Sequence, residues 1–347
     1  MMKTHVLLLL LILNTLFVNA QSDSSSFAIA FYNTENFFDP ANDSLTNDDA
    51  YTLEGSNRWS YKKMYHKRDQ LVKVFLSMNE WNPPDLIGLA EIENTVVLKA
   101  LILHPGMKKY GYHFIHFESP DTRGIDVAVL YRSTKVTILE TYPISIQFPF
   151  DPHSNNRSIL YVKALTLSSD TIHFLVNHWT SRFGGAGATI LKRNYYAQVL
   201  REKVDSLKSQ NRNALICIVG DFNDYPTDFS LYHILKASEI NKNGADLVNL
   251  MLKYSSFQNV GTHKNEVFWG CLDQIILSAP FLDSVSHFQI QNKEFIYSPD
   301  FLLMPDEKYG GFKPFRTYTG LKHTGGFSDH LPVIVVFTIK KGGIDSS

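Results

Sequence analysis

Residues 214–226 read ALICIVGDFNDYP, an apolar run that stops at a glycine followed by polar residues. An unbroken apolar run is typical of a β-strand that is buried on both faces. Asp221 and Asn223 are two residues apart, so their side chains project to the same side of an extended chain and could bind one ligand. The alternative is an ordinary turn, because glycine, aspartate, asparagine and proline are also the common turn residues.

Other predicted strands also end at polar residues, and they favour a site over a turn. The apolar runs 27–32 and 86–90 stop at an asparagine and a glutamate, and the run 171–176 stops just before Asn-His. A single such end carries little information, but several of them predict a polar site along one edge of a sheet scaffold. The residues at these ends are Asn33, Glu91, His178, Asp221, Asp273 and the pair Asp329 and His330.

Apolar periodicity predicts the remaining elements. The predicted helices span 64–76, 96–103, 191–207 and 229–237, and further strands span 112–117, 125–131, 160–167, 272–278 and 333–339. Residues 39–57 and 262–269 are predicted as loops, and 246–260 has no clear pattern.

Asp126 interrupts an otherwise apolar strand. A buried carboxylate without a partner is costly, so this side chain must be paired or face water, and Arg123 is the nearest candidate partner. Trp59, Trp179, Trp269 and His263 are expected to pack rather than to border a cleft.

The amino terminus predicts export. A lysine at position 3, an apolar run over residues 6–18 and small residues before position 21 are typical of a secretory signal peptide. We expect cleavage after Ala20, a secreted or periplasmic location and a single domain over residues 21–347. The apolar run is shorter than the roughly 20 residues that span a bilayer, which disfavours a stable membrane anchor.

Composition limits the partners. The net charge is −1, so no global basic field indicates a polyanionic ligand, although a local patch would not change this total. The two cysteines, Cys217 and Cys271, lie in apolar strand-like stretches, which favours free buried thiols over a disulfide. No obligate protein partner is evident, and a monomer is expected.

The motifs resemble those of the endonuclease/exonuclease/phosphatase superfamily, whose members are similar to pancreatic-type deoxyribonuclease. The resemblance covers about residues 27–339 and depends on the GDFN and SDH motifs at 220–223 and 328–330. Together with RGIDV at 123–127 and NHW at 177–179, these motifs look most like the bacterial secreted nuclease branch. The resemblance implies an α/β (α+β) fold, a four-layer sandwich of two packed mixed β-sheets flanked by helices.

The resemblance also implies residue roles in metal-dependent phosphodiester hydrolysis. It places Mg²⁺ or Mn²⁺ on Asn33, Glu91 and Asp329, and it places catalysis on His178, Asp221, Asn223, Asp273 and His330. Carboxylate and amide oxygens suit these ions, and an adjacent carboxylate raises the basicity of an imidazole, as expected for Asp273 and His330. Arg123, Asp126 and Arg182 are candidates for contact with substrate phosphates, with structural ion pairs as the alternative.

Three functions follow from these expectations. The favoured one is an exported endonuclease that hydrolyses DNA or RNA by in-line attack of water, with nucleic acid as the substrate. The second is a phosphodiesterase or phosphatase of the same superfamily that acts on sphingomyelin, a phosphoinositide or another small phosphate ester. The third is a catalytically silent binding protein, which the complete set of candidate site residues disfavours.

Overall fold

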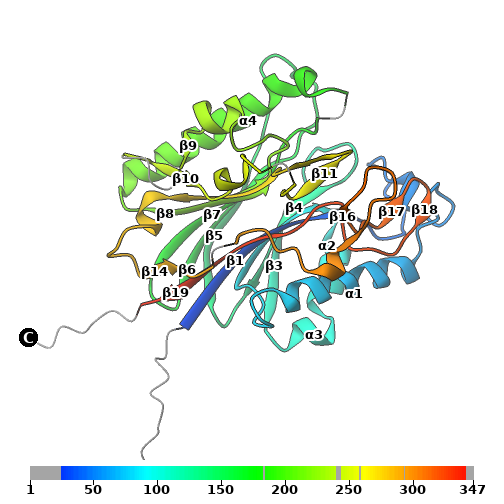
Figure 1. Ribbon diagram of the computed structural model, residues 1–347, viewed down its shortest axis with the longest axis horizontal. Helices are drawn as coiled ribbons and strands as arrows, with labels where there is room; N and C mark the ends of the chain where they lie inside the picture. The colour runs from blue at the N-terminus through cyan, green and yellow to red at the C-terminus, as the bar shows by residue number, and fades with distance from the viewer. Residues whose placement is uncertain (1–24, 183, 240–243, 258, 293, 341–347) are drawn as a thin grey trace, which may run out of the picture.

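Two mixed β-sheets pack face to face in the computed structural model, and helices cover both outer faces (Figure 1). The structure describes residues 25–182, 184–239, 244–257, 259–292 and 294–340, so the predicted signal peptide lies outside the described residues. The predicted four-layer α/β sandwich is confirmed. Within the described residues, no helix is long and apolar enough to cross a bilayer.

The two sheets share a plan: each has a pair of parallel strands near its centre, β1 beside β2 and β7 beside β8, within otherwise mainly antiparallel neighbours. The first sheet has the order β14-β19-β1-β2-β4-β3 and consists of β1 (Ser25–Phe37), β2 (Leu86–Ile92), β3 (Tyr112–His116), β4 (Asp126–Arg132), β14 (Phe288–Ile290) and β19 (Val333–Ile339). The second has the order β5-β6-β7-β8-β13-β10-β9 and consists of β5 (Val136–Ile144), β6 (Ile159–Thr166), β7 (Thr171–His178), β8 (Leu215–Asp221), β9 (Ala237–Ser238), β10 (Leu247–Asn249) and β13 (Asp273–Ser278).

Helices and small hairpins complete the chain. The α-helices are α1 (Tyr61–Ser77), α2 (Thr95–Ile102), α3 (Pro105–Lys108) and α4 (Ala186–Gln210). Three two-stranded hairpins pair β11 (His263–Asn265) with β12 (Phe268–Gly270), β15 (Leu303–Pro305) with β16 (Phe312–Pro314), and β17 (Tyr318–Thr319) with β18 (Lys322–His323). Short helical turns are η1 (Asp49–Tyr51), η2 (Ser230–Ile234), η3 (Leu252–Tyr254), η4 (Ala279–Phe281) and η5 (Asp300–Leu302).

The central strands are mostly apolar because both of their faces are buried. In β8, Cys217 and Val219 face the core between the sheets, whereas Ile216 and Ile218 pack in the outer core that α4 covers. Strand β1 divides its side chains in the same way between the central core and the outer core under α1. This alternation explains why β2 and β8 have no polar residue until they reach the edge of the sheet, whereas β7 carries His173.

Two cysteines and two tryptophans behave as predicted. Cys217 and Cys271 are both free and buried. Trp59 and Trp179 are fully buried, and each indole N–H donates a hydrogen bond, to Phe38 O at 2.9 Å and to Asn177 Oδ1 at 3.1 Å.

The structure differs from the predicted elements at three places. The predicted helix over 229–237 is only the π-helical turn η2, followed by the short strand β9. Residues 262–269 are not a loop, because they contain the hairpin of β11 and β12. Strand β5 has no counterpart in the apolar pattern, since it is an edge strand whose side chains are mostly half-buried or exposed.

The predicted pairing of Arg123 with Asp126 is also wrong. The Asp126 carboxylate lies 3.4 Å from His116 Nε2, on the neighbouring strand β3. Arg123 instead lies 3.8 Å from Asp121, which also accepts a hydrogen bond from Arg157 at 2.7 Å. The pairing of β3 with β4 brings His116 to Asp126. A local sequence pattern does not predict which strands pair.

Gly88 lies where the two sheets are packed so closely that a side chain has little room. A Cβ atom there would lie 2.9 Å from Val219 Cγ2 and 3.1 Å from both Phe31 Cδ2 and Val176 Cγ1. We expect Gly88→Ala to lower the free energy of unfolding by about 1–3 kcal/mol, because overpacking a filled core forces its neighbours apart. Urea unfolding measures this change. Gly187→Ala is the control, since nothing lies within 4 Å of its Cβ position, and an equal loss in both variants would contradict the prediction.

His173 should make the fold sensitive to acid. Burial, together with the charges of Lys163 and Lys203, lowers the pKa of His173 to about 4, and its Nδ1 lies 2.8 Å from the Tyr161 hydroxyl. Because the folded-state pKa is below the unfolded value, the stability contributed by neutral His173 is present above about pH 6.5 and is lost as the pH falls towards 4. We expect His173→Gln to flatten the decline of Tm between these pH values. A parallel decline in the variant and the wild type would contradict the assignment.

Candidate active site

Four central strands deliver polar side chains to one end of the sandwich. Asn33 and Glu91 come from the parallel pair β1 and β2, and His178 and Asp221 come from the parallel pair β7 and β8. Asp273 begins β13 and is paired in register with Asp221. Parallel neighbours end at the same edge of a sheet, so the fold collects these residues although they are far apart in sequence.

Asp221 lies at the centre of this cluster. Its Oδ2 accepts a hydrogen bond from Asn33 Nδ2 at 3.1 Å, and His178 Nε2 and His330 Nε2 lie 3.7 and 3.9 Å away. Asn33 Nδ2 also lies 3.5 Å from Glu91 Oε1. The Asn33 amide therefore links the carboxylates that the two sheets contribute.

The backbone at two of these positions is in the left-handed region. Glu91 has φ of 60° and Asn223 has φ of 51°, and Glu91 lies where the register between β2 and β4 shifts. Such conformations are costly for residues with a Cβ, and they gather where a side chain must be redirected. At Gly220 a Cβ would collide with the backbone of Asn177, which explains the glycine before Asp221.

His330 and Asp273 form the predicted pair. His330 Nδ1 lies 2.7 Å from Asp273 Oδ2, and both side chains are buried. Although burial lowers it, the carboxylates of Asp273 and Asp221 raise the pKa of His330 well above its usual value. His330 is therefore a cation whose free ring nitrogen, Nε2, faces Asp221.

Two hydroxyl groups hold this pair in place. Thr262 Oγ1 accepts the backbone N–H groups of Leu272 and Asp273, both at 3.1 Å. Ser328 Oγ accepts the N–H of His330 at 3.1 Å and donates to Asn33 O at 2.7 Å. The serine of the SDH motif thus connects β1 to the segment that carries His330.

His178 differs from His330 in its charge. Burial, followed by the charges of Arg157 and Arg123, lowers the pKa of His178 well below its usual value, so the ring is neutral. Its Nδ1 is buried and has no hydrogen-bond partner among the described residues. Nothing in the sequence pattern points to Arg157, which donates hydrogen bonds to the carbonyls of His178 and Trp179 at 2.9 and 2.7 Å.

Asn223 lies against the same segment. Its N–H donates to Asp221 Oδ1 at 3.0 Å, and its side-chain Nδ2 donates to Trp179 O at 3.1 Å. These bonds fix the turn after β8 against the end of β7. The sequence left open whether this segment is an ordinary turn or part of a site. In the structure it is both.

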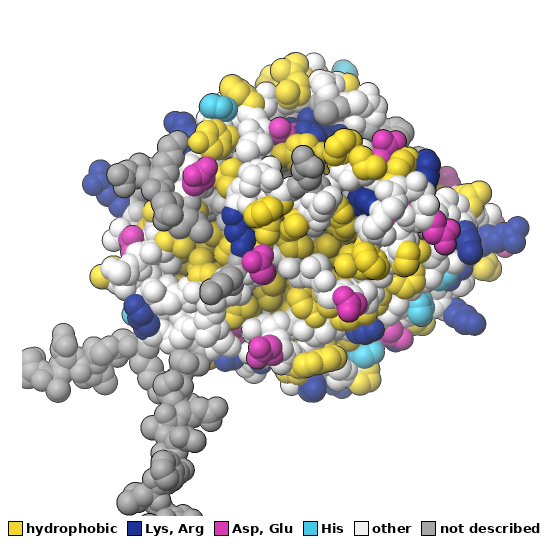
Figure 2. Space-filling model, viewed as in Figure 1, with side chains coloured by type: hydrophobic (Ala, Val, Ile, Leu, Met, Phe, Trp, Pro, Cys, Tyr) yellow, Lys and Arg dark blue, Asp and Glu magenta, His cyan; other side chains and the backbone are white. Residues whose placement is uncertain are grey.

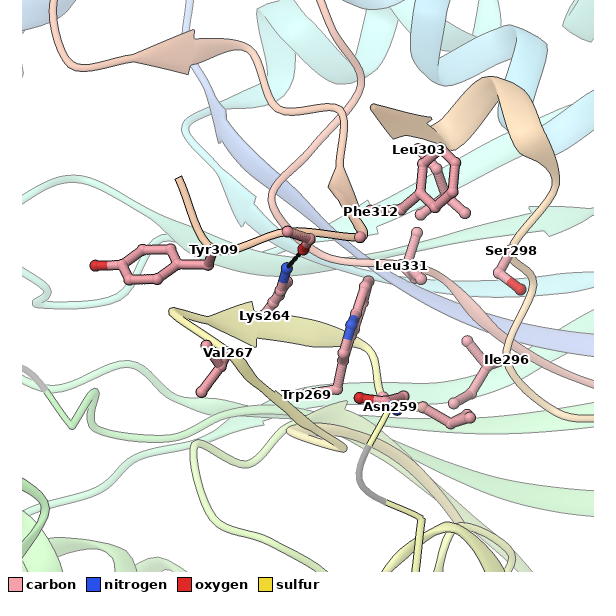
Figure 3. Close-up of a pocket in the computed structure, with 14 residues that line it drawn as sticks. Asn259, Lys264, Val267, Trp269, Ile296, Ser298, Leu303, Tyr309, Phe312 and Leu331 are labelled. Carbon is pink, nitrogen blue, oxygen red and sulfur yellow. Dashed lines mark hydrogen bonds between the residues drawn. The ribbon is translucent and has the colours of Figure 1, made fainter. Parts of the chain in front are cut away.

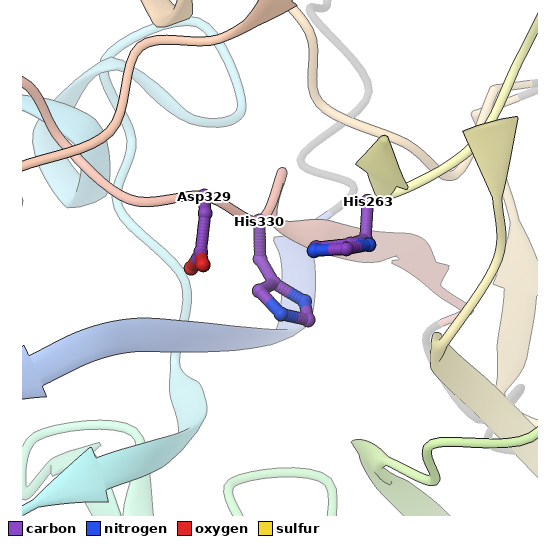
Figure 4. A group of neighbouring side chains, drawn as sticks. All are labelled: His263, Asp329 and His330. Atoms are coloured by element: carbon purple, nitrogen blue, oxygen red, sulfur yellow. The ribbon is translucent and has the colours of Figure 1, made fainter. Parts of the chain in front are cut away.

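Asp329 and His263 flank His330 on either side (Figure 4). Asp329 Oδ2 accepts a hydrogen bond from Arg316 at 2.9 Å, and the His263 and His330 rings are 4.8 Å apart. Although burial raises it, the charges of His330 and Arg316 lower the pKa of Asp329. Burial and His330 lower the pKa of His263 to about 4. His263 packs as predicted, but it packs against His330 within the site, because the hairpin of β11 and β12 brings it there.

The remaining predicted phosphate contacts are engaged elsewhere. Arg182 donates to Asp224 and Asp228 at 3.2 and 2.6 Å, and its guanidinium lies 4.3 Å from the centre of the Tyr225 ring. Arg123 is half exposed beside Asp121, and Asp126 faces His116. The structure therefore brings together Asn33, Glu91, His178, Asp221, Asp273 and His330, with Asn223 and Asp329 adjoining them. Arg123, Asp126 and Arg182 instead contact other charged side chains.

The donor atoms of the cluster fit a hard divalent cation. Glu91, Asp221 and Asp329 provide carboxylate oxygens, and the Glu91 side chain remains partly exposed, with 14% of its surface accessible. Oxygen donors of this kind suit Mg²⁺ and Mn²⁺. Such an ion would supply positive charge against a phosphoryl group, and Glu91 with its neighbours would hold it.

Two cavities lie near this cluster. One, of about 270 Å³, is polar and has Asn36, Tyr51 and Arg316 in its wall. The other, of about 670 Å³, lies around the hairpin of β11 and β12, with Lys264, Trp269 and Leu331 in its wall (Figure 3). Leu331, which lines this larger cavity, directly follows His330 in the chain.

Comparison with solved structures finds the same architecture. Humanised D. rerio TDP2 matches with a TM-score of 0.56 at 14% identity, over 91% of this chain and 100% of that chain. The human Nocturnin catalytic domain matches with a TM-score of 0.55 at 13% identity, over 91% and 95%. A mannosyl-6-phosphatase of Bacteroides thetaiotaomicron matches with a TM-score of 0.53 at 18% identity, over 90% and 100%.

Comparison with curated protein sequences gives no match. A sequence model described as "Endonuclease/Exonuclease/phosphatase family" matches residues 28–340, a range that contains every residue of the cluster. The resemblance that the GDFN and SDH motifs predict is thereby confirmed, and the chain belongs to the endonuclease/exonuclease/phosphatase family.

Proposed function

We propose that this chain is a divalent-metal-dependent phosphodiesterase that hydrolyses DNA or RNA by in-line attack of water. Its family is one of phosphodiesterases and phosphatases that are typically metal-dependent. The observation that carries the proposal is the row formed by Asp273, His330 and Asp221 beside Glu91. The D. rerio TDP2 structure with a single-strand DNA product, at a TM-score of 0.54 and 14% identity, supports nucleic acid as the substrate class.

The charge states suggest how the residues divide the chemistry. Cationic His330, held by Asp273, can donate a hydrogen bond or a proton from Nε2 to a phosphoryl or leaving-group oxygen. Neutral His178, whose Nε2 also lies near Asp221, can donate a hydrogen bond without adding charge. Asp221 can accept a proton from water, since burial and then the Asp273 carboxylate raise its pKa. Asn223 orients the phosphate in this proposal, and Asn33, Glu91 and Asp329 hold the metal.

A second candidate, a small phosphate ester, is favoured by the distribution of charge. Lys and Arg side chains are scattered over the face shown in Figure 2 and do not form one patch. Arg182 is neutralised by two aspartates, and the polar cavity of about 270 Å³ beside Arg316 would accommodate a compact polar group. The mannosyl-6-phosphatase among the similar structures is consistent with this candidate.

Location and assembly are part of the same proposal. The signal-peptide pattern of residues 1–20 supports export to the periplasm or the medium. We propose that the exported chain acts as a monomer without a stable membrane anchor or an obligate protein partner.

Asp221→Asn should lower kcat by about 100- to 10,000-fold, because it removes the proton acceptor and keeps the shape of the side chain. The measurement is hydrolysis of plasmid DNA, RNA, sphingomyelin, inositol phosphates and mannose 6-phosphate with Mg²⁺, Mn²⁺ or excess chelator. Asp283→Asn, an exposed carboxylate outside the cluster, is the matched control. Nucleic-acid cleavage that is equal in wild type and Asp221→Asn would contradict the nuclease proposal, and activity confined to a small ester would establish the second candidate. Activity that persists in excess chelator would exclude the metal-dependent mechanism.

Asp273→Asn tests the role of the buried pair. The amide still contacts His330 but no longer stabilises its positive charge, so we expect kcat to fall by at least about 100-fold with little change in KM. Thermal unfolding should show a folded variant. A fall in kcat/KM caused by KM alone would indicate that Asp273 affects substrate binding instead of proton donation.

A further inference from the structure

A second group of metal-ligating side chains lies on the outer strands of the first sheet. His116 ends β3, Asp126 begins β4, and Glu118 follows two residues after His116. His116 Nε2 lies 3.4 Å from Asp126 Oδ2, and His116 Nδ1 lies 3.7 Å from Glu118 Oε1. One donor atom from each residue lies within 4.8 Å of the others.

The two inner members of this group are buried and have unused polar atoms. The accessible fraction is 2% for the His116 side chain and 3% for Asp126. His116 Nε2 and Asp126 Oδ2 have no hydrogen-bond partner among the described residues, although each faces the other. Leaving buried polar atoms unsatisfied costs about 1–3 kcal/mol per group, so a ligand that satisfies both would stabilise this arrangement.

The spacing of His116 Nε2 and Asp126 Oδ2 matches that of two ligands on one ion, and Glu118 offers a third donor atom within 4.8 Å. Bonds from Zn²⁺ to imidazole nitrogen and carboxylate oxygen are about 2.0–2.2 Å long, which places neighbouring ligands about 3.0–3.6 Å apart. The separation of 3.4 Å between His116 Nε2 and Asp126 Oδ2 lies in this range. It is too long for a strong hydrogen bond between the two groups.

Of the three side chains, Glu118 is the one that faces solvent. The other oxygen of Asp126, Oδ1, accepts the N–H of Ser119 at 3.0 Å, which fixes the turn that carries Glu118. Glu118 is 67% exposed and lines a hollow of about 640 Å³. Asp43 and Asp49 also line this hollow, and their negative charge would draw cations towards Glu118.

We propose that His116, Glu118 and Asp126 form a second cation site, which binds a divalent metal such as Zn²⁺ or Mn²⁺. An imidazole nitrogen with two carboxylates favours these ions over Mg²⁺ and Ca²⁺, which prefer oxygen alone. The site is one strand outward from Glu91, because Asp126 is paired in register with Ile92 of β2. It is distinct from the oxygen-rich cluster around Asp221 and adds a positive centre beside the acidic hollow.

The test is Mn²⁺ binding by the full chain in a Glu91→Gln background, which weakens the other cluster. Equilibrium dialysis should show one tightly bound Mn²⁺, with pulsed electron paramagnetic resonance reporting coupling to an imidazole nitrogen. Adding His116→Gln should weaken this binding by at least about tenfold and remove the nitrogen coupling. His113→Gln, on the exposed side of the same strand, is the matched control and should change neither readout.

Zn²⁺ should bind more tightly than Mn²⁺ and displace it, as expected for a site that contains nitrogen. If His116→Gln does not fold, Glu118→Gln, at an exposed position, should weaken binding in its place. Failure of the Glu91→Gln protein to bind Mn²⁺ or Zn²⁺, or retention of the nitrogen signal in His116→Gln, would overturn the proposal. These readouts do not depend on hydrolysis, so they stand apart from the proposed function.

Discussion

Burial of the Asp221 carboxylate is the constraint around which the rest of the site is arranged. A buried charge is costly unless it is paired, and Asp221 is met by the Asn33 amide and by the two imidazoles of His178 and His330. His330 in turn requires Asp273, because burial alone would favour its neutral form. Each member therefore depends on another that a different strand supplies, and the cluster exists only when both sheets are in place.

The symmetry of the two sheets makes this assembly possible. Each sheet has a central parallel pair, and both pairs end at the same end of the sandwich. The close approach of the sheets at Gly88 and of the strands at Gly220 leaves no space for a Cβ. These two glycines allow the close packing that fixes the distances between the residues of the site.

The segments around the cluster form the cavities beside it. The hairpin of β11 and β12 brings His263 to His330 and forms part of a large cavity on its other side. Arg316 links Asp329 to Glu35 beside a small polar cavity. The group of His116, Glu118 and Asp126 lies further outward on the first sheet, at the ends of β3 and β4.

The sequence by itself determined most of the central strands and most of the cluster, because apolar runs there end at chemically distinctive residues. The family and the fold class followed from the resemblance of the GDFN and SDH motifs. The same resemblance predicted the pair of Asp273 and His330. Only the tertiary structure decided that Asp126 faces His116 and not Arg123, that His263 reaches the site, that Arg182 is neutralised, and that Arg157 supports the end of β7. These contacts depend on strand register and on short polar hairpins, which bring together residues that no local periodicity connects.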